Sequence, residues 1–413
     1  MDDLQIRMIS DWLVEQGLLG LDETGLLEGF CERCRERGLD LVQAALFLDT
    51  LHPVLESRGF VWNAEETDAT RQREFSRYQS ERNSRLWSAS PFNHMLESGL
   101  SEIHLPLDYA GEARFTILDD LRLEGHTDYF ALIHRLSGTD AIGEMDSLYS
   151  RWSTGAPGGF SSDDLQALRG LVPALALAIK AASLKRIAQS LVEVYLGRDA
   201  GHRVLEGRIA RGKVESIHTV LWYSDMANYT ALSEQVHSTD LIPLLNDYAE
   251  AVISSVHAAG GDVLKLVGDG TLAIFTGADR CEAALAALKA EAELEERIAA
   301  LNAARLAQET AVTSVYLALH VGEVFYGNVG SDERLDFTVI GPAVNEVCRI
   351  ASTCRLANRS LLVSSAFVDL LPPAETSSFE TIGSFHLKGV REPRELFARP
   401  TAPRVLSDAQ RSL

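Results

Sequence analysis

The alternation of strand and helix patterns that begins near residue 216 is the feature that most constrains the fold of this chain. Short apolar runs typical of β-strands alternate with longer segments whose apolar residues recur at helical spacing. The expected strands cover 217–224, 263–267, 271–275, 313–320 and 335–340, and the expected helices cover 238–258, 279–306 and a segment from Pro342 onward. The order β-α-β-β-α-β of the first six elements predicts a ferredoxin-like core of the α+β class.

The length of 413 residues favours two domains, because one hydrophobic core rarely organises so long a chain. Residues 1–170 can build a core of their own, since four of the five tryptophans lie there. Helices are expected at 4–17, 22–37 and 40–50. A further helix from about 161 to about 196 leads into a segment punctuated by glycines. The expected organisation is an N-terminal domain at 1–170, a helical connector at 171–212, a C-terminal domain at 213–400 and a tail at 401–413.

The net charge of −21 limits the partners of the protein. So acidic a chain repels nucleic acid and anionic lipid, and a polyanionic substrate would need local positive groups or bridging metal ions. The N-terminus has no apolar signal segment, and the apolar stretch 171–184 is too short to span a bilayer. Five cysteines form no disulfide framework. We expect a soluble, cytoplasmic protein that binds neither nucleic acid nor membranes.

Two carboxylates occupy positions suited to metal binding. Asp225 closes the first strand, and Asp269 lies in Gly268-Asp269-Gly270 between two apolar runs, which is a strong hairpin signal. Neighbouring strands of one sheet can bring both carboxylates to one edge. Hard oxygen ligands with open positions suit Mg²⁺, although each aspartate taken alone is ordinary turn chemistry.

Three further polar residues stand out. Lys265 interrupts an apolar strand four residues before Asp269. Asn345 and Arg349 lie four residues apart on one helix face, where both side chains can donate to the same phosphoryl oxygens. An Asn and an Arg on one helix face, with nothing else, are usually just solvated. It is therefore their occurrence together with Lys265 and the two aspartates that indicates a site.

In combination these residues resemble a known family. The segment 220–230 (VLWYSDMANYT) resembles the first metal motif of class III nucleotidyl cyclases, and 261–270 (GDVLKLVGDG) resembles the second. The segment 334–349 (RLDFTVIGPAVNEVCR) is similar to their base-reading and transition-state segment, and 385–390 (FHLKGV) resembles their C-terminal strand. The matches span about 210–400 in the family's order, so the resemblance implies a catalytic domain at 213–400.

The resemblance also implies a role for each residue. Two Mg²⁺ or Mn²⁺ ions per site would be bound by Asp225, Met226 and Asp269. The base would be read by Lys265 and Thr338, the terminal phosphates would meet Arg334, and the ribose and the reacting phosphorus would be held by Asn345 and Arg349. In this family two chains pair head to tail, so a homodimer would contain two equivalent sites and a monomer none.

The base-reading pair favours ATP as the substrate. Lysine only donates hydrogen bonds, so Lys265 suits the N1 acceptor of adenine, and Thr338 can accept from the 6-amino group. Guanine presents a donor at N1, which would oppose Lys265. The lysine–threonine pair resembles the subclass called class IIIb, and a bicarbonate response stays open. The expected reaction converts ATP to 3′,5′-cyclic AMP and pyrophosphate by two-metal-ion catalysis.

One position departs from the family pattern, and other readings remain. Asn228 stands where the family usually has glycine, which puts the basal rate in doubt. A catalytically weak cyclase-homology module for signalling or binding, and a guanylate-type cyclase, are the alternatives. A diguanylate cyclase is a further rival, because Gly260-Gly261-Asp262 echoes the signature of that family.

Residues 1–170 resemble the sensor region that precedes the cyclase in a group of proteobacterial proteins. The resemblance rests on stretches at 51–53, 125–129 and 158–161, and its pattern is that of a GAF-like α+β ligand domain. The domain would regulate the cyclase, and its aromatic residues either line a small-molecule pocket or form plain core. Candidate haem ligands are His52, His94, His104, His126 and His134, without a haem motif. The ligand and the sign of its effect stay open.

Overall fold

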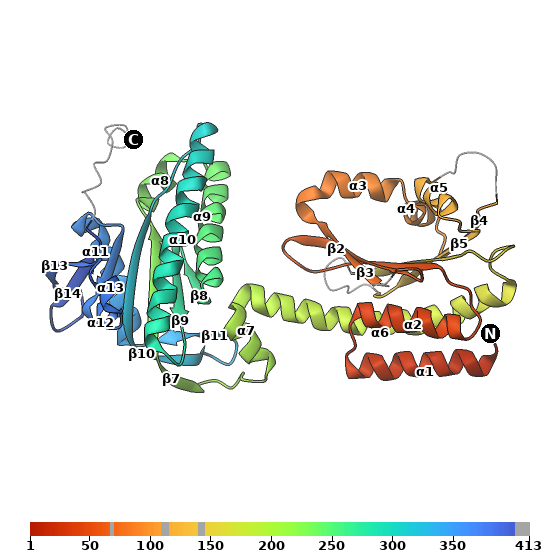
Figure 1. Cartoon of the computed structure of the whole chain (residues 1–413), viewed down its shortest axis with the longest axis horizontal. Helices are drawn as coiled ribbons and strands as arrows, with labels where there is room; N and C mark the ends of the chain where they lie inside the picture. The colour runs from red at the N-terminus through yellow and green to blue at the C-terminus, as the bar shows by residue number, and fades with distance from the viewer. Residues whose placement is uncertain (67–69, 109–114, 139–144, 401–413) are drawn as a thin grey trace. The chain divides into compact units, whose positions relative to one another are not determined.

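The chain forms two compact units, Met1–Leu191 and Val192–Leu413. The computed structural model describes residues 1–66, 70–108, 115–138 and 145–400, so the expected tail at 401–413 lies outside the described residues. Helix α6 (Ser162–Leu196) begins in the first unit and ends in the second (Figure 1). The expected helix from about 161 to about 196 is therefore confirmed.

The first unit is built on an antiparallel sheet in the order β3-β2-β1-β6-β5-β4. Its strands are β1 (Gln43–Asp49), β2 (Leu55–Asn63), β3 (Thr70–Ser76), β4 (Glu102–Pro106), β5 (Asp128–Arg135) and β6 (Ser147–Thr154). Its helices before α6 are α1 (Asp3–Leu19), α2 (Glu23–Glu36), the 3₁₀ helix η1 (Arg77–Gln79), α3 (Ser80–Ser88), α4 (Pro91–Glu97) and α5 (Thr116–Leu123). The expected helices at 4–17 and 22–37 are confirmed.

Helices cover both faces of this sheet, with α1, α2 and α6 on one side and α3, α4 and α5 on the other (Figure 1). On the first side Phe30 of α2 packs against Trp152 of β6, with ring centroids 5.3 Å apart. On the second side Tyr149 of β6 contacts Phe92 of α4 at 5.5 Å. Because strand residues alternate between faces, one strand supplies side chains to both cores.

The expected helix at 40–50 is wrong, because this segment contains strand β1. It pairs with β2 on one side and β6 on the other, and four of its first five residues are buried. A strand covered on both faces has a continuous apolar run, and periodicity alone cannot distinguish such a run from a short buried helix.

Helix α6 is long and apolar enough by length and composition to cross a membrane. In the apolar window that meets this criterion, 56% of the residues are buried inside the protein. Its buried residues include Leu168, Leu171, Leu175 and Ile179, which belong to the core of the first unit. The core helix of a globular domain meets the same criterion.

The second unit contains a mixed sheet in the order β13-β14-β12-β10-β7-β9-β8, with β11 paired to β10. Its strands are β7 (Val214–Met226), β8 (Asp262–Val267), β9 (Gly270–Phe275), β10 (Val315–Gly330), β11 (Leu335–Ile340), β12 (Leu361–Ser364), β13 (Glu380–Phe385) and β14 (Arg394–Ala398). Its helices are α7 (Arg198–Leu205), α8 (Tyr229–Gln235), α9 (Ser238–Ala258), α10 (Arg280–Ala307), α11 (Pro342–Ala357), α12 (Ser365–Val368) and α13 (Pro373–Thr376). The elements β7, α9, β8, β9, α10 and β10 confirm the predicted β-α-β-β-α-β order.

The faces of this sheet are buried by different helices. Helices α9 and α10 pack on one face, where Trp222 of β7 is fully buried. Helix α11 packs on the opposite face against Leu221, the preceding residue of β7.

Only the first residue of the expected strand at 385–390 is in a strand, because a turn containing Gly389 at φ 84° separates β13 from β14.

A buried histidine joins β10 to β12 and α11. His320 Nδ1 lies 2.8 Å from Ser364 Oγ, and its Nε2 lies 3.9 Å from Glu346 Oε2 on α11. Burial lowers the pKa of His320 to about 4, although Glu346 opposes this shift, and Arg394 and His218 reinforce it. The native protein therefore keeps this imidazole neutral at pH values where the unfolded chain protonates it.

We predict that His320 destabilises the protein in acid. Between its unfolded pKa near 6.5 and its folded pKa near 4, only the unfolded state gains a proton, so the unfolding free energy falls by up to about 3 kcal/mol as the pH is lowered. Chemical unfolding of the wild type and His320→Gln at pH 4 to 7 measures this slope. The substitution should flatten it, whereas the exposed control His386→Gln should not. Equal slopes in wild type and His320→Gln would contradict the prediction.

Candidate functional site

The structure brings Asp225, Met226 and Asp269 together. Strand β7 ends at Met226, and pairing of β7 with β9 sets the end of β7 beside the β8–β9 hairpin. The Met226 amide donates a hydrogen bond to Asp269 Oδ2 at 3.2 Å. The Asp225 and Asp269 carboxylates are close enough to share a hydrogen bond. The expectation that neighbouring strands place both carboxylates at one edge is met.

The hairpin geometry explains the glycines around Asp269. Val267 pairs with Gly270, so the two turn residues are Gly268 and Asp269, one position before the expected Asp-Gly pair. Gly268 has φ 64°, which suits the first position of a type II′ turn. A side chain at Gly270 would collide with the Tyr223 hydroxyl, so this close approach requires glycine.

The electrostatics of the aspartate pair fit a divalent cation. Burial raises the pKa of Asp225 to about 7, and the hydrogen bond and repulsion from Asp269 add to the effect. Two carboxylates this close hold a proton between them unless a cation neutralises them. Among the described residues no group of three or more His, Cys, Asp or Glu could hold a metal. A site with two carboxylates suits Mg²⁺, which retains water and binds substrate phosphates.

Lys265 and Thr338 lie on two strands that an ion pair connects. Lys265 on β8 pairs with Asp336 on β11, two residues before Thr338. Residues i and i+2 of a strand share a face, so Asp336 lies on the same face as Thr338. Lys265 is exposed and Thr338 is buried. Asp336 was not singled out from the sequence as a site residue. Its position two residues before Thr338 on the same expected strand could have indicated that both lie on one face.

Asn345 and Arg349 are exposed on α11, one turn apart. Between them Glu346 is buried and pairs with Arg394 of β14, which anchors the helix to the sheet. Within the described residues, no hydrogen bond or ion pair joins the Asn345 or Arg349 side chain to the aspartate pair. Both side chains are therefore free to meet another group.

Cys348 shows that α11 lies close to the aspartate pair. Burial raises the pKa of its thiol, Arg349 opposes the shift, and Asp225 adds to it.

Arg334 is exposed in the turn before β11, where its amide donates to Ser331 Oγ at 3.2 Å. It lies on a different segment from the α11 pair.

Asn228 has a backbone conformation that explains the departure from glycine. It precedes α8 with φ 61° and ψ 25°, in the left-handed region. Glycine adopts this region most readily, and asparagine is among the few other residues that tolerate it. Asn228 can therefore adopt the same left-handed backbone conformation that glycine would adopt at this position.

We predict that Asn228→Gly is tolerated and that Asn228→Ala destabilises the protein by about 1 kcal/mol, because alanine is disfavoured in the left-handed region. Denaturant unfolding of both variants measures the difference. Ser233→Ala in the exposed part of α8 serves as a control for altered helix stability. An alanine variant as stable as the glycine variant would contradict this explanation.

Comparison with known proteins identifies the family of the domain that carries these residues. Residues 213–398 match the family model of the adenylate and guanylate cyclase catalytic domain. These residues form a class III cyclase domain. The match covers the β-α-β-β-α-β core of the second unit and all eight residues predicted for the site.

Curated relatives agree with this assignment. An adenylate cyclase of Anabaena cylindrica is 29% identical over 193 residues, which are 45% of this chain and 37% of the relative. An uncharacterised protein of Mycobacterium tuberculosis is 30% identical over 217 residues, which are 51% of this chain and 38% of the relative. The chain thus spans little more than a third of each of these relatives.

Solved structures of cyclases are also similar to the second unit. The adenylyl cyclase CyaB from P. aeruginosa is 23% identical with a TM-score of 0.42, over 46% of this chain and 98% of that one. The guanylyl cyclase Cya2 is 21% identical with a TM-score of 0.40, over 47% and 97%. Both adenylyl and guanylyl cyclases are therefore among the similar structures.

Proposed function

We propose that this protein is an adenylate cyclase that converts ATP to 3′,5′-cyclic AMP and pyrophosphate at the interface of a homodimer. The observation that carries the proposal is the aspartate pair at the C-terminal end of β7. This pair lies within a cyclase domain whose Lys265 and Thr338 suit adenine. The ribose 3′-hydroxyl loses its proton to solvent and attacks the α-phosphorus, the bond from that phosphorus to the oxygen bridging to the β-phosphate breaks, and pyrophosphate leaves.

The aspartate pair is the proposed site for two divalent cations. Asp225 and Asp269 would bind them through carboxylate oxygens and Met226 through its backbone carbonyl, since its amide already donates to Asp269. Bound Mg²⁺ or Mn²⁺ lowers the pKa of the attacking hydroxyl and neutralises the leaving phosphates. Arg349 and Asn345 donate hydrogen bonds to the negative charge that develops on phosphorus and to the ribose.

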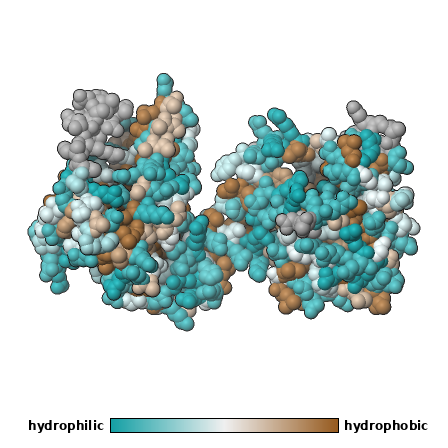
Figure 2. All heavy atoms as spheres, viewed as in Figure 1, coloured by the Kyte–Doolittle hydropathy of each residue, from teal (hydrophilic) through white to brown (hydrophobic). Residues whose placement is uncertain are grey.

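A second copy of this chain is the proposed partner that completes the site. In one chain no hydrogen bond or ion pair joins the side chains of Asn345 and Arg349 to the aspartate pair, within the part of the chain that the structure describes. Large apolar side chains are exposed on the strands that carry Lys265 and Thr338, namely Leu266 and Val267 on β8 and Ile340 on β11, and Phe325 is exposed on β10, which pairs with β11. Exposed apolar groups of this kind typically become buried in an interface. Figure 2 shows apolar patches on a largely hydrophilic surface.

A guanylate cyclase is the second candidate, because Asp336 lies beside Lys265. The N1–H and the 2-amino group of guanine are donors, and a carboxylate accepts from both. When Lys265 donates to this carboxylate, its ammonium group keeps two further N–H donors, so Lys265 and Thr338 can still read adenine.

We predict a higher kcat/KM for ATP than for GTP, by at least about tenfold, because guanine N1–H opposes the lysine donor. Initial rates with each nucleotide and Mg²⁺ or Mn²⁺, with products identified by mass spectrometry, measure this ratio. A ratio below one would establish the guanylate reading. If neither nucleotide gives a cyclic product, the protein would be a cyclase-homology binding module and not an enzyme.

Two variants test the shared site. Asp225→Ala should abolish metal-dependent turnover, and Arg349→Ala should lower kcat by roughly 10²–10³, the effect of losing one donor to a developing charge. If Asp225 and Arg349 act from opposite chains, mixing the variants forms heterodimers with one intact site and recovers about a quarter of wild-type activity. No recovery on mixing, with heterodimers verified by tagged co-purification, would place the whole site in one chain.

A further inference from the structure

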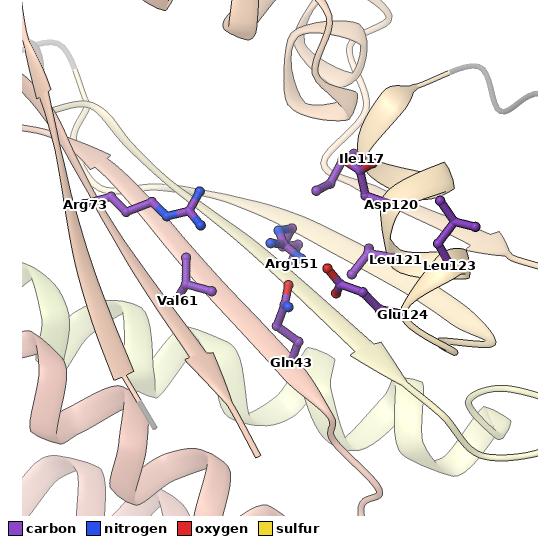
Figure 3. A pocket seen from close by; sticks show the side chains of 9 residues that line it. All are labelled: Gln43, Val61, Arg73, Ile117, Asp120, Leu121, Leu123, Glu124 and Arg151. Atoms are coloured by element: carbon purple, nitrogen blue, oxygen red, sulfur yellow. The ribbon is translucent and has the colours of Figure 1, made fainter. Parts of the chain in front are cut away.

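The first unit contains a cavity that is separate from the cyclase site. It has a volume of about 410 Å³, which lies in the range of small-molecule sites. Its lining comes from the sheet face beside α5 and from α5 itself: Gln43, Val61, Arg73, Ile117, Asp120, Leu121, Leu123, Glu124 and Arg151 (Figure 3). A second hollow of about 490 Å³ shares Gln43, Val61, Arg73 and Glu124 with it, so the space continues beyond Glu124.

Arg151 on β6 is the unusual member of this lining. Only 8% of the residue is exposed, and its Nη1 is buried without a hydrogen-bond partner in the described part of the chain. The Tyr129 hydroxyl beside it is also buried and unpaired. A buried cation normally has a counter-charge, because losing its hydration without one is costly.

The protein itself provides too little compensation for this cation. Burial lowers the pKa of Arg151 and the charge of Arg73 adds to this shift, while Tyr129 and Glu124 oppose it without cancelling it. Glu124 Oε2 also lies 3.6 Å from His126 Nε2. The other guanidinium of the cavity, Arg73, extends toward Arg151 in Figure 3 and adds positive charge. An anionic group is therefore missing at the sheet side of the cavity.

The α5 side of the cavity has the opposite charge. Asp120 and Glu124 lie there, and Ile117 and Leu121 add apolar surface between the two sides. The carboxylates would repel a nucleotide or another polyanion, and they suit an ammonium group. The complementary molecule carries a carboxylate, an amine and a short apolar body.

We propose that this cavity binds a small zwitterion of the α-amino-acid class. Its carboxylate pairs with Arg151 and Arg73, and its ammonium group faces Asp120 and Glu124. The side chain lies against Ile117 and Leu121 and can extend into the second hollow. A planar guanidinium binds a carboxylate through two parallel hydrogen bonds, which the Arg151 side chain that lines the cavity can offer.

Calorimetric titration of the full chain with each standard L-amino acid in turn tests the proposal without reference to cyclase activity. One or more should bind with a stoichiometry of one per chain. For each that binds, the analogue without the amine and the analogue without the carboxylate should both bind at least about tenfold more weakly, since each loses a charged pair. If no amino acid binds at millimolar concentration, or if the analogue without the amine binds equally well, the proposal is overturned.

Arg151→Met distinguishes a ligand-binding arginine from a structural one. Methionine keeps the length and removes an uncompensated charge, so the free variant should melt at or above the wild-type temperature while amino-acid binding is lost. The matched control Arg82→Met, on the exposed part of α3, should alter neither property. Arg151→Lys should bind with intermediate affinity, because it keeps the charge and loses the fork. A less stable Arg151→Met protein, or one with unchanged binding, would contradict the proposal.

Discussion

The close approach of Asp225 and Asp269 is the constraint on which the candidate site of the second unit depends. The long pairing of β7 with β10 and β9, and the tight β8–β9 turn, hold two carboxylates within hydrogen-bonding range of each other. Burial, together with the hydrogen bond and the repulsion from Asp269, raises the pKa of Asp225 to about 7. The fold therefore stores an unfavourable charge arrangement that divalent metal and substrate would relieve.

The first unit presents the same physical situation with the opposite sign. Arg151 is a buried cation whose Nη1 has no hydrogen-bond partner among the described residues, in a cavity on the sheet face that α5 covers. Each unit thus has a place where its own residues leave a charge uncompensated. Other buried charges in the described parts of the chain are paired, as Glu346 is with Arg394 and Glu23 is with Arg186.

Much of the second unit could be predicted from sequence because local signals there agree with the tertiary structure. The hairpin at 268–270, the proline that opens α11 and the apolar faces of α9 and α10 each indicate one element type. Prediction failed where a segment is buried on both faces, as in β1, and at the turn after Phe385. The roles assigned to Lys265, Thr338, Asn345 and Arg349 stay predictions, since nothing in one chain tests them.

The sequence by itself determined the kind of domain at 213–398 and the chemical groups available to it, because residue type and spacing carry that information locally. Only the tertiary structure decided which charges meet. Asp225 and Asp269 are 44 positions apart, and Lys265 and Asp336 are 71 apart, so strand pairing sets their proximity. Only the fold shows that Arg151 is buried and unpaired, because burial depends on the side chains that surround it and not on its neighbours in the chain.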